Sequence, residues 1–321
     1  MPEVSTHSAA RICEATSARI CAVVINYFGS AKTRRCLDSL AREHLATIYV
    51  IDNSTDDDER TRLEGVVASV AAAYPTTKID LVINNANLGF GRTINELIAQ
   101  DLLLAKPHDY YLLINNDAEL RQGATLHLAQ ALDADPCVAL VAPRVRTAHG
   151  TTDFFYYWRY GGGVSLRPHR LAFPFLTGCC LMVPRRFATT RALFDRDFFM
   201  YGEDVLLAWH VHRAGLKSVA VPRSEVLHEG TGSSRHGGLF YEYHVARGHI
   251  LLALKMTRHP AEVPFLLAGR AAMLLVRACL RALRYRTPAP ILAYALCWFD
   301  VGVRPPNPPR GPRDPDVEVH P

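Results

Sequence analysis

The sequence predicts an α/β fold in which helices flank a mostly parallel sheet. Short runs of apolar, β-branched residues recur through the first third of the chain, and such runs are typical of buried parallel strands. Helical stretches separate them, and strands that alternate with helices favour right-handed βαβ units in one sheet. With 321 residues, the chain can hold one large α/β domain and an extension.

The first four predicted strands each end at polar residues. We expect the strands at Ile20–Ile25, Ile48–Ile51, Ile79–Ile83 and Tyr110–Ile114. The polar residues that follow them are Asn26, Asp52, Asn84 and the run Asn115, Asn116 and Asp117. Helices are expected after these strands at Ala31–Arg42, Glu59–Ala73, Arg92–Ala105 and Gly123–Ala134.

The pattern is less regular in the middle of the chain. Val138–Ala142 is expected to be a fifth strand that Pro143 closes. From Arg144 to Phe175 we expect surface loops and short antiparallel strands. The remaining expected elements are strands at Cys180–Val183 and Ser218–Val221 and a helix at Glu203–Ala214.

The composition is ordinary for a globular protein, with 49% hydrophobic and 21% charged residues. A net charge of +5 is mild, and no basic motif with interleaved aromatic residues indicates nucleic-acid binding. None of the eight cysteines forms a CxxC pair. Their scatter favours a reduced cytosolic protein over a disulfide framework or a zinc site.

We expect four parts along the chain. Residues 1–18 lack a basic start and a long apolar stretch, so they are expected to be a disordered tail rather than a secretory signal. Residues 19–245 are expected to form the α/β domain, and residues 246–303 a helical extension. Residues 304–321 are rich in proline and charge and are expected to be a second disordered tail.

The polar strand ends indicate a binding site. In open α/β sheets, ligands bind outside the carboxyl ends of the strands. Asn and Asp also start turns, but their presence at the ends of four successive strands favours a binding site over turn formation alone. Asp117, beside Asn115 and Asn116, is suited to Mg²⁺ or Mn²⁺, and Asp52 is suited to accept hydrogen bonds from a base or ribose.

Three further segments carry groups suited to catalysis or binding. Gly89 and Gly91 precede a helix, where backbone N–H groups favour anions. Glu203 and Asp204 begin another helix, and an acid there could cap the helix or act as a general base. His228 follows a strand and precedes a Gly/Ser-rich loop, and neutral imidazole is a ready metal ligand.

Taken in order, seven segments resemble an inverting family 2 glycosyltransferase with the GT-A fold, in its bacterial rhamnosyltransferase-like branch. The segments are VVINYFGS, VIDNST, NLGFGRTIN, LLINNDAEL, TGCCLMVPRRFA, FMYGEDVLLAWHVHRAG and VLHEGTGSS. The resemblance covers about Ile20 to His249. The chain departs from the family at Phe28, where the family commonly has Asn, and in having a single acid, Asp117, in the metal motif.

The resemblance implies a role for each matching residue. Asp204 would be the catalytic base, with Glu203 beside it, and Asp117 and His228 would hold Mg²⁺ or Mn²⁺. The nucleotide sugar would be bound by Asn26, Asp52, Asn87, Gly89, Gly91, Asn95, Asn116 and Gly178. The donor would be dTDP-rhamnose or a UDP-sugar. The acceptor is expected to be a saccharide, and a basic C-terminal surface suggests one linked to polyprenyl diphosphate, in assembly of polysaccharide, capsule or lipopolysaccharide.

The C-terminal helical stretch Phe265–Leu283 carries a basic stripe. Arg270, Arg277, Arg281 and Arg284 share this stripe, and we expect Leu266 and Leu274 on the opposite side. No uninterrupted apolar run is long enough to span a bilayer. A basic amphipathic helix often lies on anionic membranes, which predicts a cytoplasmic protein on the inner face of the bacterial cell membrane. The alternative is a helix that packs on the α/β domain with its arginines in water.

Other functions fit the sequence less well. A dehydrogenase requires a GxGxxG turn after the first strand, and this chain has NYFGSAKT there. A sugar-nucleotide nucleotidylyltransferase would carry a Gly- and Lys-rich loop at the same place, which is missing. A non-catalytic, membrane-bound assembly partner with the same fold stays open.

Overall fold

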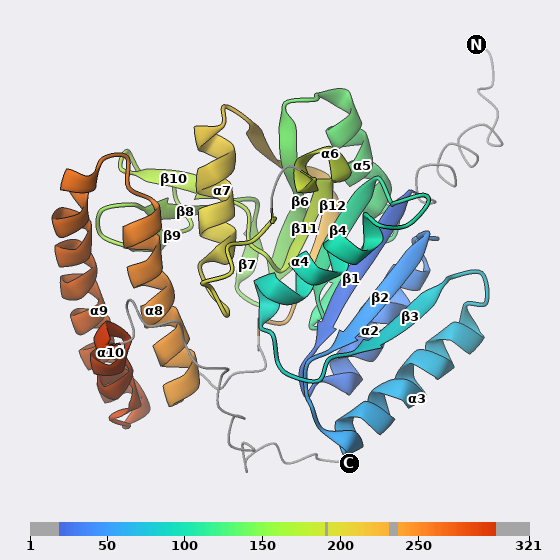
Figure 1. Ribbon diagram of the computed structural model, residues 1–321, viewed down its shortest axis with the longest axis horizontal. Coiled ribbons are helices and arrows are strands. Elements are labelled where there is room, and N and C mark those ends of the chain that lie inside the picture. The colour runs from blue at the N-terminus through green and yellow to red at the C-terminus, as the bar shows by residue number, and fades with distance from the viewer. Residues whose placement is uncertain (1–18, 190–191, 231–236, 300–321) are drawn as a thin grey trace.

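The computed structural model describes residues 19–189, 192–230 and 237–299 (Figure 1). The two predicted tails and most of the Gly/Ser-rich loop lie outside these ranges. The described chain forms one large mixed sheet, with strand order β3-β2-β1-β4-β11-β6-β12-β5 and β7 paired to β6. Helices cover both faces, which confirms the predicted α/β class.

The predicted first half of the sheet is confirmed. Strands β1 (Ile20–Asn26), β2 (Thr47–Asp52), β3 (Ile79–Ile83) and β4 (Tyr110–Asn115) are parallel neighbours. Helices α2 (Ser30–Ala41), α3 (Asp57–Ala73) and α4 (Phe90–Asp101) connect them. One face of the sheet packs against α2, α3 and α5 (Ala124–Ala134), and the other against α4, α6 (Arg185–Ala188) and α7 (Glu203–Arg213).

The second half of the sheet contains longer strands than expected. The strands are β5 (Ala118–Leu120), β6 (Val138–Thr147), β11 (Cys180–Pro184) and β12 (Lys217–His228). β11 runs antiparallel to β4, and β12 runs parallel to β6. Pro143 does not close β6, because the register of β12 shifts between Val221 and Glu225 and this bulge lies opposite the proline.

The irregular region contains short antiparallel strands, as predicted. β7 (Gly150–Thr152) pairs with β6, and β8 (Phe155–Trp158), β9 (Val164–Ser165) and β10 (Ala172–Phe175) form a separate small sheet. This small sheet lies at the same end of the molecule as the C-terminal helices (Figure 1).

The C-terminal extension consists of α8 (Leu239–Lys255), a 3-10 turn (Pro260–Glu262), α9 (Val263–Tyr285) and α10 (Ala289–Phe299). The three helices pack against one another around a small apolar core. The domain boundary expected after residue 245 falls inside α8. By length and composition, Pro260–Tyr285 is long and apolar enough to cross a membrane, with mean hydropathy 1.7. The sequence prediction did not include it, because arginines interrupt its apolar residues.

The interpretation of the arginine stripe is wrong for three of its four residues. Arg270 is fully buried, and Arg277 and Arg281 point at the buried Glu242 of α8. Leu274 lies on the same buried face of α9 as Arg270, because residues four apart are neighbours on a helix. These three arginines therefore face neither lipid nor water but the inside of the protein, and Arg284 alone of the four is exposed.

Candidate active site

Three strand ends are joined by a buried chain of hydrogen bonds. Parallel register sets Asn26 of β1 beside Asp52 of β2. Asn26 Nδ2 donates to Asp52 Oδ1 (3.0 Å), and Asn26 Oδ1 accepts from Thr33 Oγ1 (2.9 Å). Thr33 Oγ1 in turn accepts from Asn116 Nδ2 (3.1 Å). The polar ends of β1, β2 and β4 thus meet at one edge of the sheet.

Glu59 is a further member of this network. It is buried in the first turn of α3, where its Oε1 accepts from Asn26 Nδ2 (3.1 Å) and from Ser30 N (2.9 Å). Asp52 Oδ1 accepts two more bonds, from the N–H (3.1 Å) and Oγ (2.7 Å) of Ser54. Glu59 was not predicted, because nothing in the sequence separates it from the acids around it at the start of a helix.

Asp117 and His228 form a pair at this edge. β12 pairs with β5 so that His228 lies opposite Ala118, which brings His228 Nε2 to 3.2 Å from Asp117 Oδ1. Burial is the largest single influence on Asp117 and opposes its ionisation, but the hydrogen bond from His228 and the charges of His228 and Lys32 together outweigh burial and lower the pKa of the carboxyl. Asp117 Oδ2 is buried and has no hydrogen-bond partner among the described residues. Such an atom is costly unless a ligand satisfies it.

Lys32 adds positive charge beside this pair. It lies in the first turn of α2, and its charge also lowers the pKa of Asp117. Its Nζ lies 4.0 Å from Glu229 Oε2. Lys32 was not predicted, although a lysine at the start of the helix after the first strand is well placed for an anion.

Asp204 reaches the same edge from the start of α7. Its Oδ2 accepts a hydrogen bond from Gly178 N (3.1 Å), and its Oδ1 from Val205 N (2.8 Å). Gly178 lies just before β11, which runs antiparallel to β4 and so begins where β4 ends. Burial, together with the charges of Asp117 and Asp204, raises the pKa of the Cys179 thiol to about 12. Both acids therefore lie close enough to influence the same buried thiol.

Glu203 and Asp204 are poorly solvated neighbours. Glu203 is buried, and its Oε2 has no hydrogen-bond partner within the described ranges. Burial and then the adjacent Asp204 raise the pKa of Glu203 to about 8. Burial also raises the pKa of Asp204, although N–H groups of Gly178 and Val205 favour its charged form. Asp204 keeps part of its surface exposed, so it is the one able to meet a hydroxyl group.

Asn95 and Gly91 contact Phe194 rather than the open edge. Asn95 Nδ2 donates to Phe194 O (2.8 Å), and Asn95 Oδ1 accepts from Phe194 N (3.0 Å). A β-carbon at Gly91 would lie 2.7 Å from the Phe194 Cβ. Both residues hold the Phe194 segment against α4.

The start of α4 is covered in the same way. Phe90 N donates to Phe199 O (3.0 Å), and Gly89 N donates to Asn87 Oδ1 (3.0 Å). Gly89 has φ 75°, and a β-carbon there would lie 2.3 Å from Phe199 O, so only glycine fits. The backbone N–H groups of Gly89 and Phe90 lie at the helix start where we expected anion binding, and both already have hydrogen-bond partners.

A family model and two curated relatives match this chain. The family model described as "Glycosyltransferase like family 2" matches residues 18–240. The chain is 28% identical over 285 residues to N-acetylglucosaminyl-diphospho-decaprenol L-rhamnosyltransferase of Mycobacterium tuberculosis, in strains CDC 1551 and H37Rv, covering 77% of this chain and 89% of that protein.

Two solved structures share the fold. The mannosyltransferase PcManGT from Pyrobaculum calidifontis, in complex with GDP-Man and Mn²⁺, has a TM-score of 0.53 at 18% identity, covering 87% of this chain and 86% of that one. GalNAc-T7 with UDP, GalNAc and Mn²⁺ has a TM-score of 0.54 at 15% identity, covering 90% and 58%. The fold is therefore that of the GT-A glycosyltransferases.

Proposed function

The chain belongs to glycosyltransferase family 2, and we propose on that basis that it transfers a sugar with inversion from a nucleotide-diphosphate donor to a hydroxyl of a lipid-linked saccharide. One observation carries the proposal. Asp52, the Asp117–His228 pair and Asp204 come from separate elements, and the network around Asn26, the strand pairings and Gly178 relate all of them to one edge of the sheet.

The donor is proposed to lie along the ends of β1, β2 and β4. Asp52, fixed through its Oδ1, faces the base or ribose, and Lys32 lies where it can meet a diphosphate. Asp117 and His228 suit Mg²⁺ or Mn²⁺, because Asp117 Oδ2 is buried without a partner. They would hold the ion together with phosphate oxygens and water. A cation bound there neutralises charge on the leaving diphosphate.

Asp204 is proposed to be the base. It accepts the proton of the acceptor hydroxyl while that oxygen bonds to the anomeric carbon and the bond from this carbon to the diphosphate oxygen breaks. The Gly178 N–H fixes the carboxylate during the step. A single in-line displacement inverts the configuration at the anomeric carbon.

The name of a mycobacterial relative supports a proposal for the substrates. The mycobacterial relative is named for transfer of rhamnose to N-acetylglucosaminyl-diphospho-decaprenol. We infer a dTDP-rhamnose or UDP-sugar donor and a polyprenyl-diphosphate-linked saccharide acceptor, in assembly of bacterial polysaccharide, capsule or lipopolysaccharide. Such an acceptor places the enzyme on the cytoplasmic face of the cell membrane. The family match favours this function over a nucleotidylyltransferase or a non-catalytic partner.

The test combines a donor panel with one substitution. Release of nucleoside diphosphate from dTDP-rhamnose and UDP-sugars is measured with Mn²⁺ and a lipid-linked acceptor. Asp204→Asn is expected to lower turnover by about 10²–10⁴ while calorimetry still shows nucleotide binding. Asp38→Asn makes the same change on the outer side of α2 and should leave turnover unchanged. Near-normal turnover in Asp204→Asn would remove this residue from the role of base.

A further inference from the structure

In α9 most of the charged side chains point into the protein, and apolar side chains are exposed to solvent. Arg270 Nη2 donates to the Arg159 carbonyl oxygen (2.6 Å) in the interior. Arg277 Nη1 (2.5 Å) and Arg281 Nε (2.6 Å) both donate to the carboxylate of Glu242. Because these cations are engaged inside the protein, the face that α9 turns outward is the apolar one.

The outward face is large and apolar on both terminal helices. In the second half of α9 its most exposed members are three or four residues apart, which aligns them on one side of the helix. Those more than half exposed are Phe265, Val276, Leu280 and Leu283 on α9 and Leu292 and Phe299 on α10. An exposed apolar surface of this kind marks an interaction site in a soluble protein.

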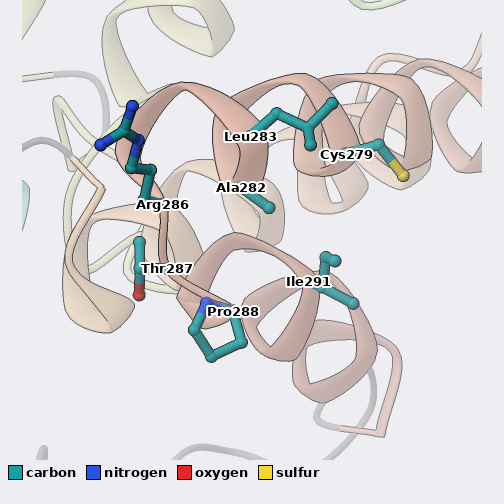
Figure 2. A pocket seen from close by; sticks show the side chains of 7 residues that line it. All are labelled: Cys279, Ala282, Leu283, Arg286, Thr287, Pro288 and Ile291. Atoms are coloured by element: carbon teal, nitrogen blue, oxygen red, sulfur yellow. The ribbon is translucent and has the colours of Figure 1, made fainter.

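The charged residues of the segment that bears this face are all positive. Residues 263–299 contain five arginines and no Asp, Glu or Lys. Two of the arginines, Arg284 and Arg286, are exposed at the end of α9. Figure 2 shows Arg286 beside Leu283 and Ile291 around a cavity of about 470 Å³ between the end of α9 and the start of α10. Cationic groups therefore border the apolar surface without interrupting it.

Two glycines make close contacts with or from α9, one at each half of the helix. Gly237 packs on Tyr285, since a β-carbon at Gly237 would lie 2.7 Å from the ring. At the other half of α9, Gly269 packs on the backbone of Tyr160, whose side chain is exposed on the small sheet.

We propose that the apolar face of α9 and α10 inserts into the acyl-chain boundary of an anionic bilayer, with Arg284 and Arg286 at the level of the lipid phosphates. The helices lie in the interface rather than cross it, because a crossing helix would carry the buried Arg270 into hydrocarbon. This inference deepens the proposed function, since a lipid-linked acceptor requires the active site at a membrane.

The charge pattern favours lipid over a second copy of the chain. Two copies joined through this face would bring together surfaces whose bordering charges, Arg284 and Arg286 of each copy, are all positive. An anionic leaflet instead offers acyl chains for the apolar residues and phosphates for the exposed arginines. Exposed Trp158 and Tyr160 on the neighbouring small sheet are the side chains typical of a membrane interface.

The test is flotation of the full-length protein with vesicles of phosphatidylcholine and phosphatidylglycerol, without donor or acceptor. Wild type should float with the vesicles, and Leu280→Glu with Leu283→Glu should lower the bound fraction about tenfold or more. The matched control is Leu103→Glu with Leu104→Glu, two exposed leucines beyond α4, which should float as wild type does. Thermal unfolding checks that both variants are folded.

Two results would overturn the inference. The first is flotation of the α9 variant equal to that of the control. The second is a wild-type dimer in light scattering that the α9 substitutions convert to monomer while vesicle binding persists, which would assign the face to a second copy. Because flotation needs no turnover, its failure leaves sugar transfer standing, and lost turnover with normal flotation counts only against sugar transfer.

Discussion

The pairing of Glu242 with two arginines should be among the most important polar contacts for the stability of the extension. Glu242 is 1% exposed, and Arg277 and Arg281 are 21% and 20% exposed. The change Glu242→Gln keeps the shape of the side chain but removes the charge that both guanidinium groups share. Arg281 Nη2 is buried and already lacks a partner among the described residues, so it has no substitute acceptor at hand.

The expected loss follows from this burial. Removing one partner of a buried ion pair costs about 3–5 kcal/mol, because the remaining charge is left uncompensated. For a chain of this size, about 2 °C of Tm is lost per kcal/mol, which gives a fall of about 6–10 °C. Thermal unfolding followed by circular dichroism measures it.

An exposed pair provides the control. Glu96 binds Arg92 four residues away (2.8 Å), and both are about half exposed. Glu96→Gln should cost only about 0.3–0.5 kcal/mol, or a change in Tm of about 1 °C. If Glu242→Gln lowers Tm no more than Glu96→Gln does, the pair is solvated in solution and the inward direction of the stripe is mistaken. The triple change Glu242→Met, Arg277→Leu and Arg281→Leu should restore much of the lost stability.

Two further predictions concern the active site. Glu203 has its pKa raised from 4.5 to about 8, so the folded state binds more protons than the unfolded state between these values, and stability should fall as pH rises through that window. Glu203→Gln should flatten the dependence of Tm on pH from 5 to 8 and raise Tm at pH 8; a slope equal to that of wild type would mean that Glu203 is ionised when folded. Asp117→Asn should weaken nucleotide binding at least about tenfold in Mn²⁺ but little in EDTA, and unchanged affinity by calorimetry in Mn²⁺ would exclude a metal role.

The parts of the fold that could be predicted are those that local patterns determine. Strands β1 to β4 were found because buried parallel strands read as uninterrupted apolar runs. The continuation of β6 through Pro143 was missed because it depends on a bulge in β12, some 80 residues later in the chain. The direction of the stripe was missed because its partner, Glu242, lies in another helix, and periodicity shows which residues share a face but not which face is buried.

The residues of the candidate site also divide into those that local patterns predict and those that depend on packing. Asn26, Asp52, Asn116 and Asp117 directly follow strands, so the topology alone predicted that they would meet. Thr33, Glu59 and Lys32 lie on helices, and their place in the site depends on how those helices pack. Asn95 was expected to bind the donor, yet both ends of its amide contact Phe194, a contact between residues 99 positions apart.

The fastening of Phe194 and Phe199 to α4 has a consequence for catalysis. Asp204 follows Phe199 by five residues, and Phe199 is bound to the first residue of the helix that follows β3. The proposed base, Asp204, and the strands proposed to face the donor are thus anchored to a common frame before any substrate arrives. Because these groups are held in place in advance, substrate binding or product release is expected to limit the rate, rather than a rearrangement of the catalytic groups.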